Sequence, residues 1–258
     1  MRKLIFFLLI LFFTVSCFAQ SKKKQRQEEK REHINSLIRQ EEEGVITYKK
    51  SFLFGAKLIT DGYGAFFELG RASSIKKSML YQLEISERKN KKEEKVSYYA
   101  NTVPYIYGKV NFFYPVKLGV QQQVLLGNKS NKNGVSVTAN YGGGISAGLL
   151  RPYYVQVQQG NQINYIKYNS ADSAAFLTSK IYGGPSFGKG WSDMTVVPGL
   201  YAKAAVRFDY GSYNEVISAI EVGVTGDYYT KKVPLLAYNP EKQFFFSGYV
   251  SILFGKRK

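Results

Sequence analysis

Residues 244–254, near the C-terminus, read FFFSGYVSILF. Every second residue counted back from Phe254 is apolar or glycine, which gives the face Ile252, Val250, Gly248, Phe246 and Phe244. Side chains of a β-strand alternate between two faces, so this face must meet an apolar medium along its whole length. The other face is mixed and carries Phe245, Ser247, Tyr249, Ser251 and Leu253. Such a strand suits either a membrane barrel wall or a sandwich core.

The same period of two continues from Ile46 to this segment. In residues 50–60, Phe52, Phe54, Ala56 and Leu58 alternate with Ser51, Gly55 and Lys57, and an Asp-Gly hairpin signal follows at residues 61–62. Residues 135–149 alternate in the same way and keep small residues along one face. That segment is far longer than the roughly 5–6 residues usual in globular sheets. The pattern therefore predicts a barrel wall.

Ten strand segments are expected, an even number as single-chain bacterial barrels require. The fourth is placed near Pro104–Phe112 and the seventh at Tyr153–Gln159, with an external loop at Asn128–Asn133. Splitting or merging the weak segments near Phe112 or Tyr153 would give eight or twelve. The predicted fold is all-β: an antiparallel up-and-down transmembrane barrel over residues 46–255, followed by a basic tail at residues 256–258.

Residues 1–19 are typical of a secretory signal peptide. A charged start, Met1-Arg2-Lys3, precedes an apolar run from Leu4 to Val15, and Ala19 stands before the expected cut. The run is shorter than the roughly 20 apolar residues of a membrane-spanning helix. The alternative is lipoprotein processing at Cys17. Cleavage after Ala19 would instead remove the only cysteine, leaving neither disulfide nor thiolate chemistry in the exported chain.

Residues 20–45 form a charged leader, expected in the periplasm. Ile34, Leu37 and Ile38 are spaced for a short amphipathic helix around Glu28–Arg39. Two interpretations stay open. The leader is a solvated linker, or its helix enters the lumen as a plug or docks on a partner.

The composition suits a barrel that lies among anionic lipids. The chain holds 21 Tyr, 18 Phe and 24 Gly but only 7 Pro, as aromatic girdles and continuous curved strands require. Loss of Arg2 and Lys3 with the signal lowers the formal charge from +17 to +15. The positive charges gather in loops and at strand ends, where lipid headgroups or lipopolysaccharide phosphates would lie. Outer-membrane lipid and lipopolysaccharide are the expected partners, and no nucleic acid is expected.

The signal ending in Phe18-Ala19-Gln20, the alternating strands and the terminal YVSILF at residues 249–254 resemble small, porin-like outer-membrane β-barrel proteins of the Bacteroidota type. The resemblance spans residues 46–254. It implies an outer-membrane location and recognition of the last strand by the barrel-assembly machinery, through Phe246, Val250, Ile252 and Phe254. The chain departs from it in Gly255–Lys258, which extend past the aromatic. It implies no catalytic residue, because members of this fold do unrelated things.

Strand parity predicts ten charged residues on the lumen face: Lys57, Glu68, Glu84, Lys109, Lys117, Lys203, Arg207, Asp209, Glu221 and Asp227. One interpretation is an interior selective for ions or a ligand. The other is a closed interior in which these charges pair with one another. Barrels of eight to ten strands are filled by their side chains or hold something small, whereas open channels need about 16 strands, so the closed interior is favoured.

Catalysis is not expected. The only histidine, His33, lies in the leader, which leaves neither a His-dependent hydrolytic site nor the usual zinc ligands in the barrel. No cofactor is predicted.

The loops hold the better functional candidates. Five cations in one loop are predicted to contact lipopolysaccharide phosphate or else to be merely solvated: Arg88, Lys89, Lys91, Lys92 and Lys95. Two functions remain open. The first is a structural or interaction barrel that acts through its loops or leader, and the second is a narrow channel or ligand-uptake barrel with a charged lumen.

Overall fold

A computed structural model describes residues 25–29, 31–32, 35–36, 48–74, 76–97, 103–129, 134–159, 162–168, 181–186, 188–211 and 216–258. The chain divides into two units, Met1–Tyr48 and Lys49–Lys258. The first unit is helical at residues 25–29, 31–32 and 35–36, within the expected leader. The predicted signal peptide and His33 lie outside the described residues. In the described part, no helix has the length and apolar character needed to cross a membrane.

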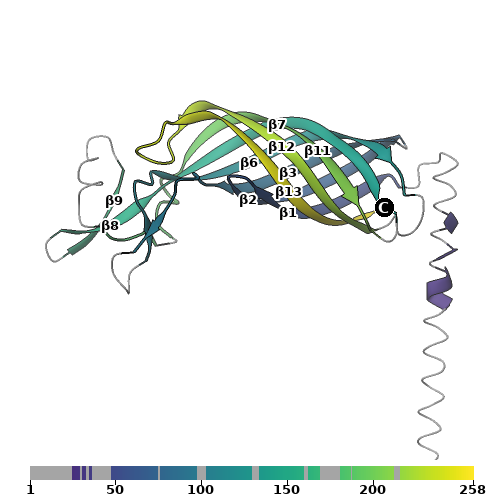
Figure 1. Ribbon diagram of the computed structural model, residues 1–258, viewed down its shortest axis with the longest axis horizontal. Coiled ribbons are helices and arrows are strands. Elements are labelled where there is room, and N and C mark those ends of the chain that lie inside the picture. The colour runs from purple at the N-terminus through teal and green to yellow at the C-terminus, as the bar shows by residue number, and fades with distance from the viewer. Residues whose placement is uncertain are drawn as a thin grey trace, which may run out of the picture. The chain divides into compact units, whose positions relative to one another are not determined.

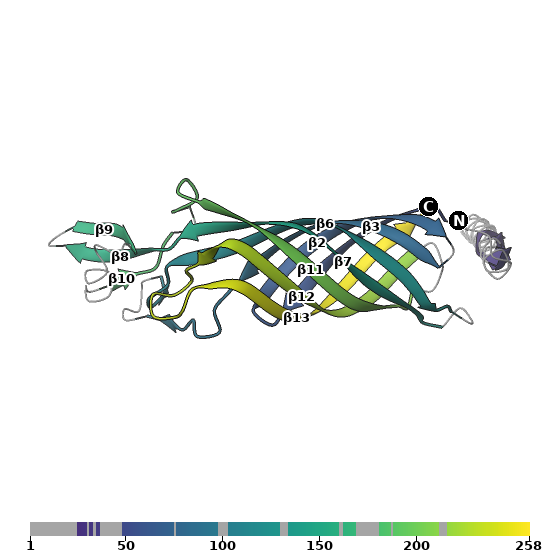
Figure 2. The same ribbon diagram turned by 90° about the horizontal axis from the view of Figure 1, so that it is seen from above.

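Eight strands of the second unit close into an antiparallel barrel in the order β1-β13-β12-β11-β7-β6-β3-β2 (Figures 1 and 2). Their bounds are β1 Lys50–Ile59, β2 Gly62–Ser74, β3 Lys77–Arg88, β6 Asn111–Gly127, β7 Ser136–Pro152, β11 Thr195–Asp209, β12 Val216–Val233 and β13 Lys242–Arg257. Each strand pairs with its neighbour along the chain or across a loop, and β13 returns to β1. The all-β up-and-down fold is therefore confirmed.

The wall has eight strands, which is the lower of the two alternatives to the expected ten. Two of the segments predicted to be wall strands are therefore not part of the wall. The predicted fourth strand does not cross the wall. It contains β5 (Tyr105–Ile106), which pairs with β4 (Lys95–Val96) away from the wall, and its last two residues begin β6. The predicted seventh strand becomes β8 (Tyr154–Gln159). It joins β9 (Gln162–Lys167) and β10 (Ile181–Gly183) in a separate sheet.

The two ends of the barrel differ. One, here called the turn end, holds the start of β1, the end of β13 and the connections after β2, β6 and β11. The other, the loop end, holds the long connections after β3, β7 and β12 (Figure 1). Because two predicted strands do not cross the wall, the segment after β6 lies at the turn end. The connections after β3 and after β6 therefore lie at opposite ends, so the expectation that both are external loops cannot hold for both. Of the expected loop Asn128–Asn133, residues 130–133 lie outside the described residues.

Three loop-end connections pack into a folded cap. Its buried apolar cluster draws from the loops after β3, β7 and β12: Tyr105, Ile106, Tyr153, Val155, Val157, Ile181 and Leu236. Main-chain hydrogen bonds join the loops, among them Val110 N–H to the Leu235 carbonyl at 2.9 Å. The β8–β9 hairpin reaches beyond the wall strands (Figure 2). The described parts of the long loops thus form a folded extension of the barrel.

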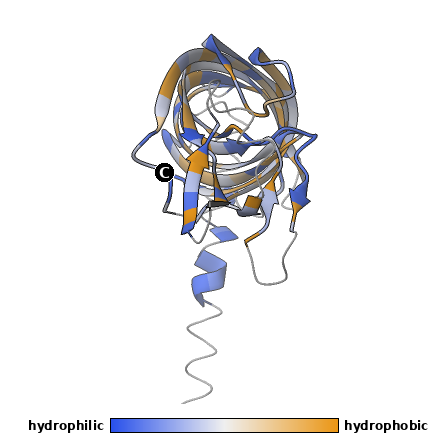
Figure 3. Cartoon of the chain, turned by 90° about the vertical axis from the view of Figure 1, so that its left-hand side faces the viewer, coloured by the Kyte–Doolittle hydropathy of each residue, from blue (hydrophilic) through white to orange (hydrophobic). Residues whose placement is uncertain are grey.

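The outer face of the wall is apolar, as parity predicts. Phe54, Leu83, Ile220 and Phe254 are all exposed on it. Figure 3 views the ring from its loop end and shows hydrophobic and hydrophilic residues alternating along the strands. Water-facing apolar surface of this extent is costly, whereas lipid tails accommodate it. The wall therefore has the outer surface of a transmembrane barrel.

The barrel closes where β1 meets β13. Phe54 pairs in register with Phe254, and their ring centroids lie 6.2 Å apart. The expected closure of Phe254 against the first strand is confirmed. The pairing continues past it to Lys256 opposite Phe52, so the predicted tail at residues 256–258 is largely part of β13. The residues that extend past the aromatic thus lengthen the closing pair of strands.

We expect Phe254→Ala to impair assembly more than Phe208→Ala. Both side chains face outward, at 46% and 40% exposure, but only Phe254 lies on the closing strand opposite an aromatic of β1. Losing the cross-strand aromatic pair weakens the pairing of β1 with β13 that closes the ring. The fraction of barrel showing heat-modifiable mobility, measured with outer-membrane yield, checks this. Equal yields of the two variants would contradict it.

Candidate functional site

The interior of the barrel is crossed by two ion pairs that join opposite walls. β2 and β11 stand four places apart in the ring of eight, as do β3 and β12. The carboxylate of Glu68 in β2 accepts hydrogen bonds from both terminal guanidinium nitrogens of Arg207 in β11, at 2.9 and 3.0 Å. Arg88 of β3 pairs with Asp227 of β12. Since each bridge spans the full width of the ring, the side chains meet in the middle of the lumen.

Glu221 of β12 is the most connected carboxylate of this network. Its oxygens lie 2.7 Å from the Arg207 guanidinium and 3.1 Å from the Lys203 ammonium, and they accept a hydrogen bond of 2.8 Å from the Asn140 amide. The Tyr249 hydroxyl donates a further hydrogen bond at 2.8 Å. A fully buried carboxylate needs such compensation, because it has left water entirely.

A second group of charges lies between β1, β3, β6 and β12. Lys57 pairs with Glu84, and Lys117 lies 3.5 Å from Glu84 and 2.7 Å from Asp227. The Lys57 ammonium also lies 4.2 Å from the centre of the Tyr249 ring. Cations and carboxylates therefore alternate across the lumen, and both signs are compensated.

Apolar clusters lie on either side of these charges. Toward the turn end Leu53, Phe66, Ile217, Ala219 and Leu253 pack together. Toward the loop end the cluster holds three aromatic residues: Phe113, Tyr229 and Phe245. The Phe113 ring lies 5.2 Å from Tyr229 and 5.5 Å from Phe245. The charged layer is thus enclosed by apolar side chains above and below.

Gly148 makes room for the loop-end cluster. A Cβ at this position would lie 2.7 Å from the Phe113 ring and 2.9 Å from the Tyr229 ring, closer than real Cβ contacts allow. The three rings can therefore fill the lumen only because the facing wall residue lacks a side chain.

Asp209 belongs to a separate ionic cluster at the turn end. Its carboxylate lies 2.7 Å from the guanidinium of Arg257 and 3.5 Å from Lys129, and it accepts the Gly211 N–H at 3.0 Å. Arg257 comes from the segment predicted to be a free tail. At this end of the barrel, ion pairs thereby join β11 to β13 and to the segment that follows β6.

All ten charged residues predicted for the lumen are buried: Lys57, Glu68, Glu84, Lys109, Lys117, Lys203, Arg207, Asp209, Glu221 and Asp227. Lys109 departs from the expected location, since it lies outside the wall strands in the cap and pairs with Glu93 at 2.6 Å. Burial lowers the pKa of Lys109, while the adjacent Glu93 carboxylate opposes the shift.

Arg88 is the clear error among the predicted loop cations. It was expected either to contact lipopolysaccharide or to be solvated, yet it is 1% exposed and joins the lumen network. Its parity with Glu84 and Ser86 on β3 could have placed it there, but the charged run that follows it obscured the end of the strand. The other four, Lys89, Lys91, Lys92 and Lys95, are exposed at the loop end.

Sequence analysis also missed the polar residues that complete the network. Lys203 contacts Gln82 at 3.1 Å, Gln121 hydrogen-bonds to Gln82, and Asn140 binds Glu221. All three amides lie on the inward parity of their strands, which was the available signal. No group of three potential His, Cys, Asp or Glu metal ligands occurs within the described part of the chain.

The cap holds a buried tyrosine and a surface tyrosine with distinct partners. Burial raises the pKa of Tyr153 to about 12, although its oxygen accepts the Ile106 N–H at 2.8 Å. On the surface the Tyr154 hydroxyl donates to Asp193, and this hydrogen bond lowers the pKa of the carboxyl. Trp191 stacks on Tyr114 at 5.9 Å and lies over the Arg151 guanidinium at 4.6 Å. These contacts hold the cap against the wall.

Neither a protein family model nor a curated protein matches the sequence. Several solved structures are similar, and three of them are described here. The N-terminal β-barrel domain of Pseudomonas aeruginosa OprF is 8% identical, with a TM-score of 0.35 over 80% of this chain and 96% of that one. Neisserial surface protein A (NspA) is 12% identical, with a TM-score of 0.36 over 82% and 96%. Ail, the attachment invasion locus protein of Yersinia pestis, solved with the heparin analogue sucrose octasulfate, is 8% identical, with a TM-score of 0.37 over 82% and 99%.

The architecture itself is that of a small outer-membrane β-barrel. An even-numbered antiparallel ring, an apolar outer face and short turns opposite longer loops occur together in the second unit. The finer likeness to barrels of the Bacteroidota type stays a prediction.

We expect Glu221→Gln to destabilise the barrel by about 3–5 kcal/mol, because removing one partner of a buried ion pair leaves the others uncompensated. Lys203 and Arg207 would lose their shared carboxylate. Denaturant unfolding in detergent micelles measures the change. Glu241→Gln, at an exposed loop position, is the control and should stay within about 0.5 kcal/mol of the wild type. Equal stabilities of the two variants would show that the network is not needed.

Proposed function

We propose that this protein is an outer-membrane barrel whose lumen is closed and whose function lies in its folded cap. The observation that carries the proposal is the pair of ion bridges across the full width of the ring, Glu68–Arg207 and Arg88–Asp227. A solute passing through would have to break both bridges, and the apolar clusters above and below offer it no polar path.

The proposed location follows from the outer face and the N-terminal sequence. An apolar belt around a closed ring is stable in lipid. Residues 1–19 act in this proposal as the export signal, and the last strand, with Phe246, Val250, Ile252 and Phe254, is what the assembly machinery recognises. The long loops face outward and the turn end faces the periplasm.

The cap supplies the interaction surface. β9 lies at the edge of the described three-stranded sheet and exposes Ile163 at 50% and Tyr165 at 38%. An exposed sheet edge with apolar side chains is suited to adding a strand from a protein partner. The loop lysines Lys89, Lys91, Lys92 and Lys95 lie at the same end, where lipopolysaccharide phosphates would meet them. The role proposed is binding, without catalysis.

Purified barrel in planar bilayers should give no stable conductance steps above background, because the lumen network blocks ion flow. A 16-stranded porin in the same bilayer is the positive control. Reproducible single-channel steps from the wild-type barrel would refute the closed-lumen proposal and favour the narrow channel or uptake barrel.

A cysteine introduced at the cap should be labelled on intact cells. Gln162→Cys lies on the exposed β9, while Lys76→Cys lies at the turn end. A membrane-impermeant maleimide should modify the first variant on whole cells and the second only after the outer membrane is opened. The reverse pattern would invert the proposed orientation, and extraction of the chain by carbonate would exclude membrane insertion.

A further inference from the structure

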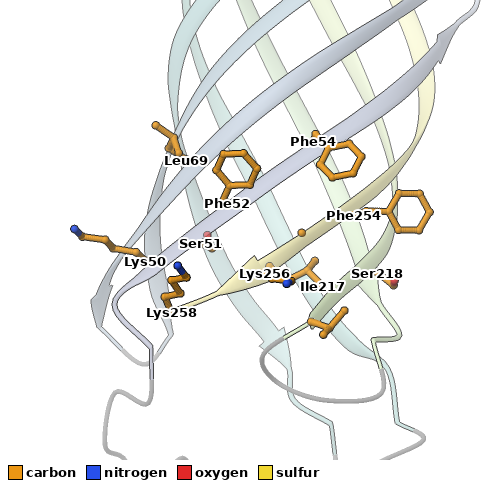
Figure 4. Close-up of a pocket in the computed structure, with 12 residues that line it drawn as sticks. Lys50, Ser51, Phe52, Phe54, Leu69, Ile217, Ser218, Phe254, Lys256 and Lys258 are labelled. Atoms are coloured by element: carbon orange, nitrogen blue, oxygen red, sulfur yellow. The ribbon is translucent and has the colours of Figure 1, made fainter.

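A cavity of about 630 Å³ lies on the outer wall at the turn end, over the seam between β1 and β13. Its apolar lining includes Phe52, Phe54, Leu69 and Phe254, and three lysines also line it: Lys50, Lys256 and Lys258. Figure 4 shows the aromatic rings farther along the wall from the strand ends than the lysines. No acidic side chain lines this cavity in the described chain.

Register explains the order of these side chains. Along the outward face of the seam, Phe54 stands opposite Phe254, and Phe52 stands opposite Lys256. Lys50 and Lys258 come next, joined by reciprocal main-chain hydrogen bonds of 2.8 Å. The seam therefore changes from two aromatics, to one aromatic and one lysine, to two lysines within three cross-strand pairs. This order of apolar and then cationic side chains matches the order of an acyl chain and a charged headgroup in a lipid.

The pairing of two lysines is itself informative. Like charges directly opposite one another on a sheet are destabilising. All three lysines are exposed, and none of them forms an ion pair with a carboxylate side chain of the described residues. A bound anion would relieve this repulsion, and the adjacent apolar surface favours an anion that carries a hydrocarbon chain.

We propose that this cavity is a binding site for an anionic phospholipid of the inner leaflet of the outer membrane. The phosphate contacts Lys50, Lys256 and Lys258, and an acyl chain lies against Phe52, Phe54 and Phe254. The proposal rests on the membrane location and orientation proposed above, since the turn end must face the leaflet built of phospholipids. It adds a specific ligand at a site separate from the cap and the lumen.

Native mass spectrometry of the chain purified from membranes tests the site. Phosphatidylglycerol and zwitterionic phosphatidylethanolamine with matched acyl chains are titrated separately. The wild type should retain phosphatidylglycerol more strongly. Lys50→Gln combined with Lys256→Gln should weaken that retention about tenfold, equivalent to about 1.4 kcal/mol for two headgroup-contacting lysines.

The matched control is Lys76→Gln combined with Lys77→Gln. These lysines are exposed at the same end of the barrel but do not line the cavity, so retention should stay at the wild-type value. Equal weakening in both double variants would overturn the site in favour of a general charge effect. Equal retention of the two lipids by the wild type would overturn it as well, as would stronger retention of lipopolysaccharide.

Inorganic phosphate separates a lipid site from a simple anion site. Phosphate at the same concentration should fail to displace phosphatidylglycerol, and full displacement would overturn the acyl-chain contact. Heat-modifiable mobility of each variant reports folding, and Lys258→Gln replaces the double variant if that one does not fold. A folded barrel without lipid preference overturns this site alone, whereas a chain that never inserts overturns the proposed function too.

Discussion

Charge inside a narrow barrel is the constraint on which this structure depends. A carboxylate or ammonium group that leaves water must find its compensation within reach of its own side chain. In a ring of eight strands that reach extends to the opposite wall, as Arg207 shows by bridging β11 to Glu68 of β2. Some of the charges therefore pair across the ring and others pair with the neighbouring strand, as Arg207 does with Glu221 of β12.

This constraint separates the barrel into regions with different roles. The lumen holds charges that pair with one another and the rings of Phe113, Tyr229 and Phe245. In the function proposed above, recognition belongs to the cap, whose three loops share one apolar cluster, and to the outer wall at the turn end. A rigid wall holds both surfaces in place.

Sequence parity predicted the two faces of the wall well, because a strand has a period of two whatever its neighbours are. Strand count failed because β8 alternates like a wall strand: one side of it, with Val155 and Val157, packs into the cap cluster. Tyr105 and Ile106 are consecutive and both buried, which an alternating wall strand would not show. Parity could not predict which charged residues of the lumen pair with one another. Which carboxylate Lys117 meets depends on the stagger of strands that are distant in sequence.

The residues after Phe254 extend β13 past the aromatic at which the resemblance implies that the strand ends, and they make contacts of their own. A strand that stopped at Phe254 would leave Ser51, Phe52 and Leu53 of β1 without partners on β13. Continuation through Arg257 adds the charge that binds Asp209 at the inner mouth, while Lys256 points outward beside Phe52. Alternation thus sends neighbouring cations to opposite sides of one wall. The inward one pairs with Asp209 of the barrel. Lys256 and Lys258 stay exposed on the outer wall, where the headgroup of the proposed lipid would meet them.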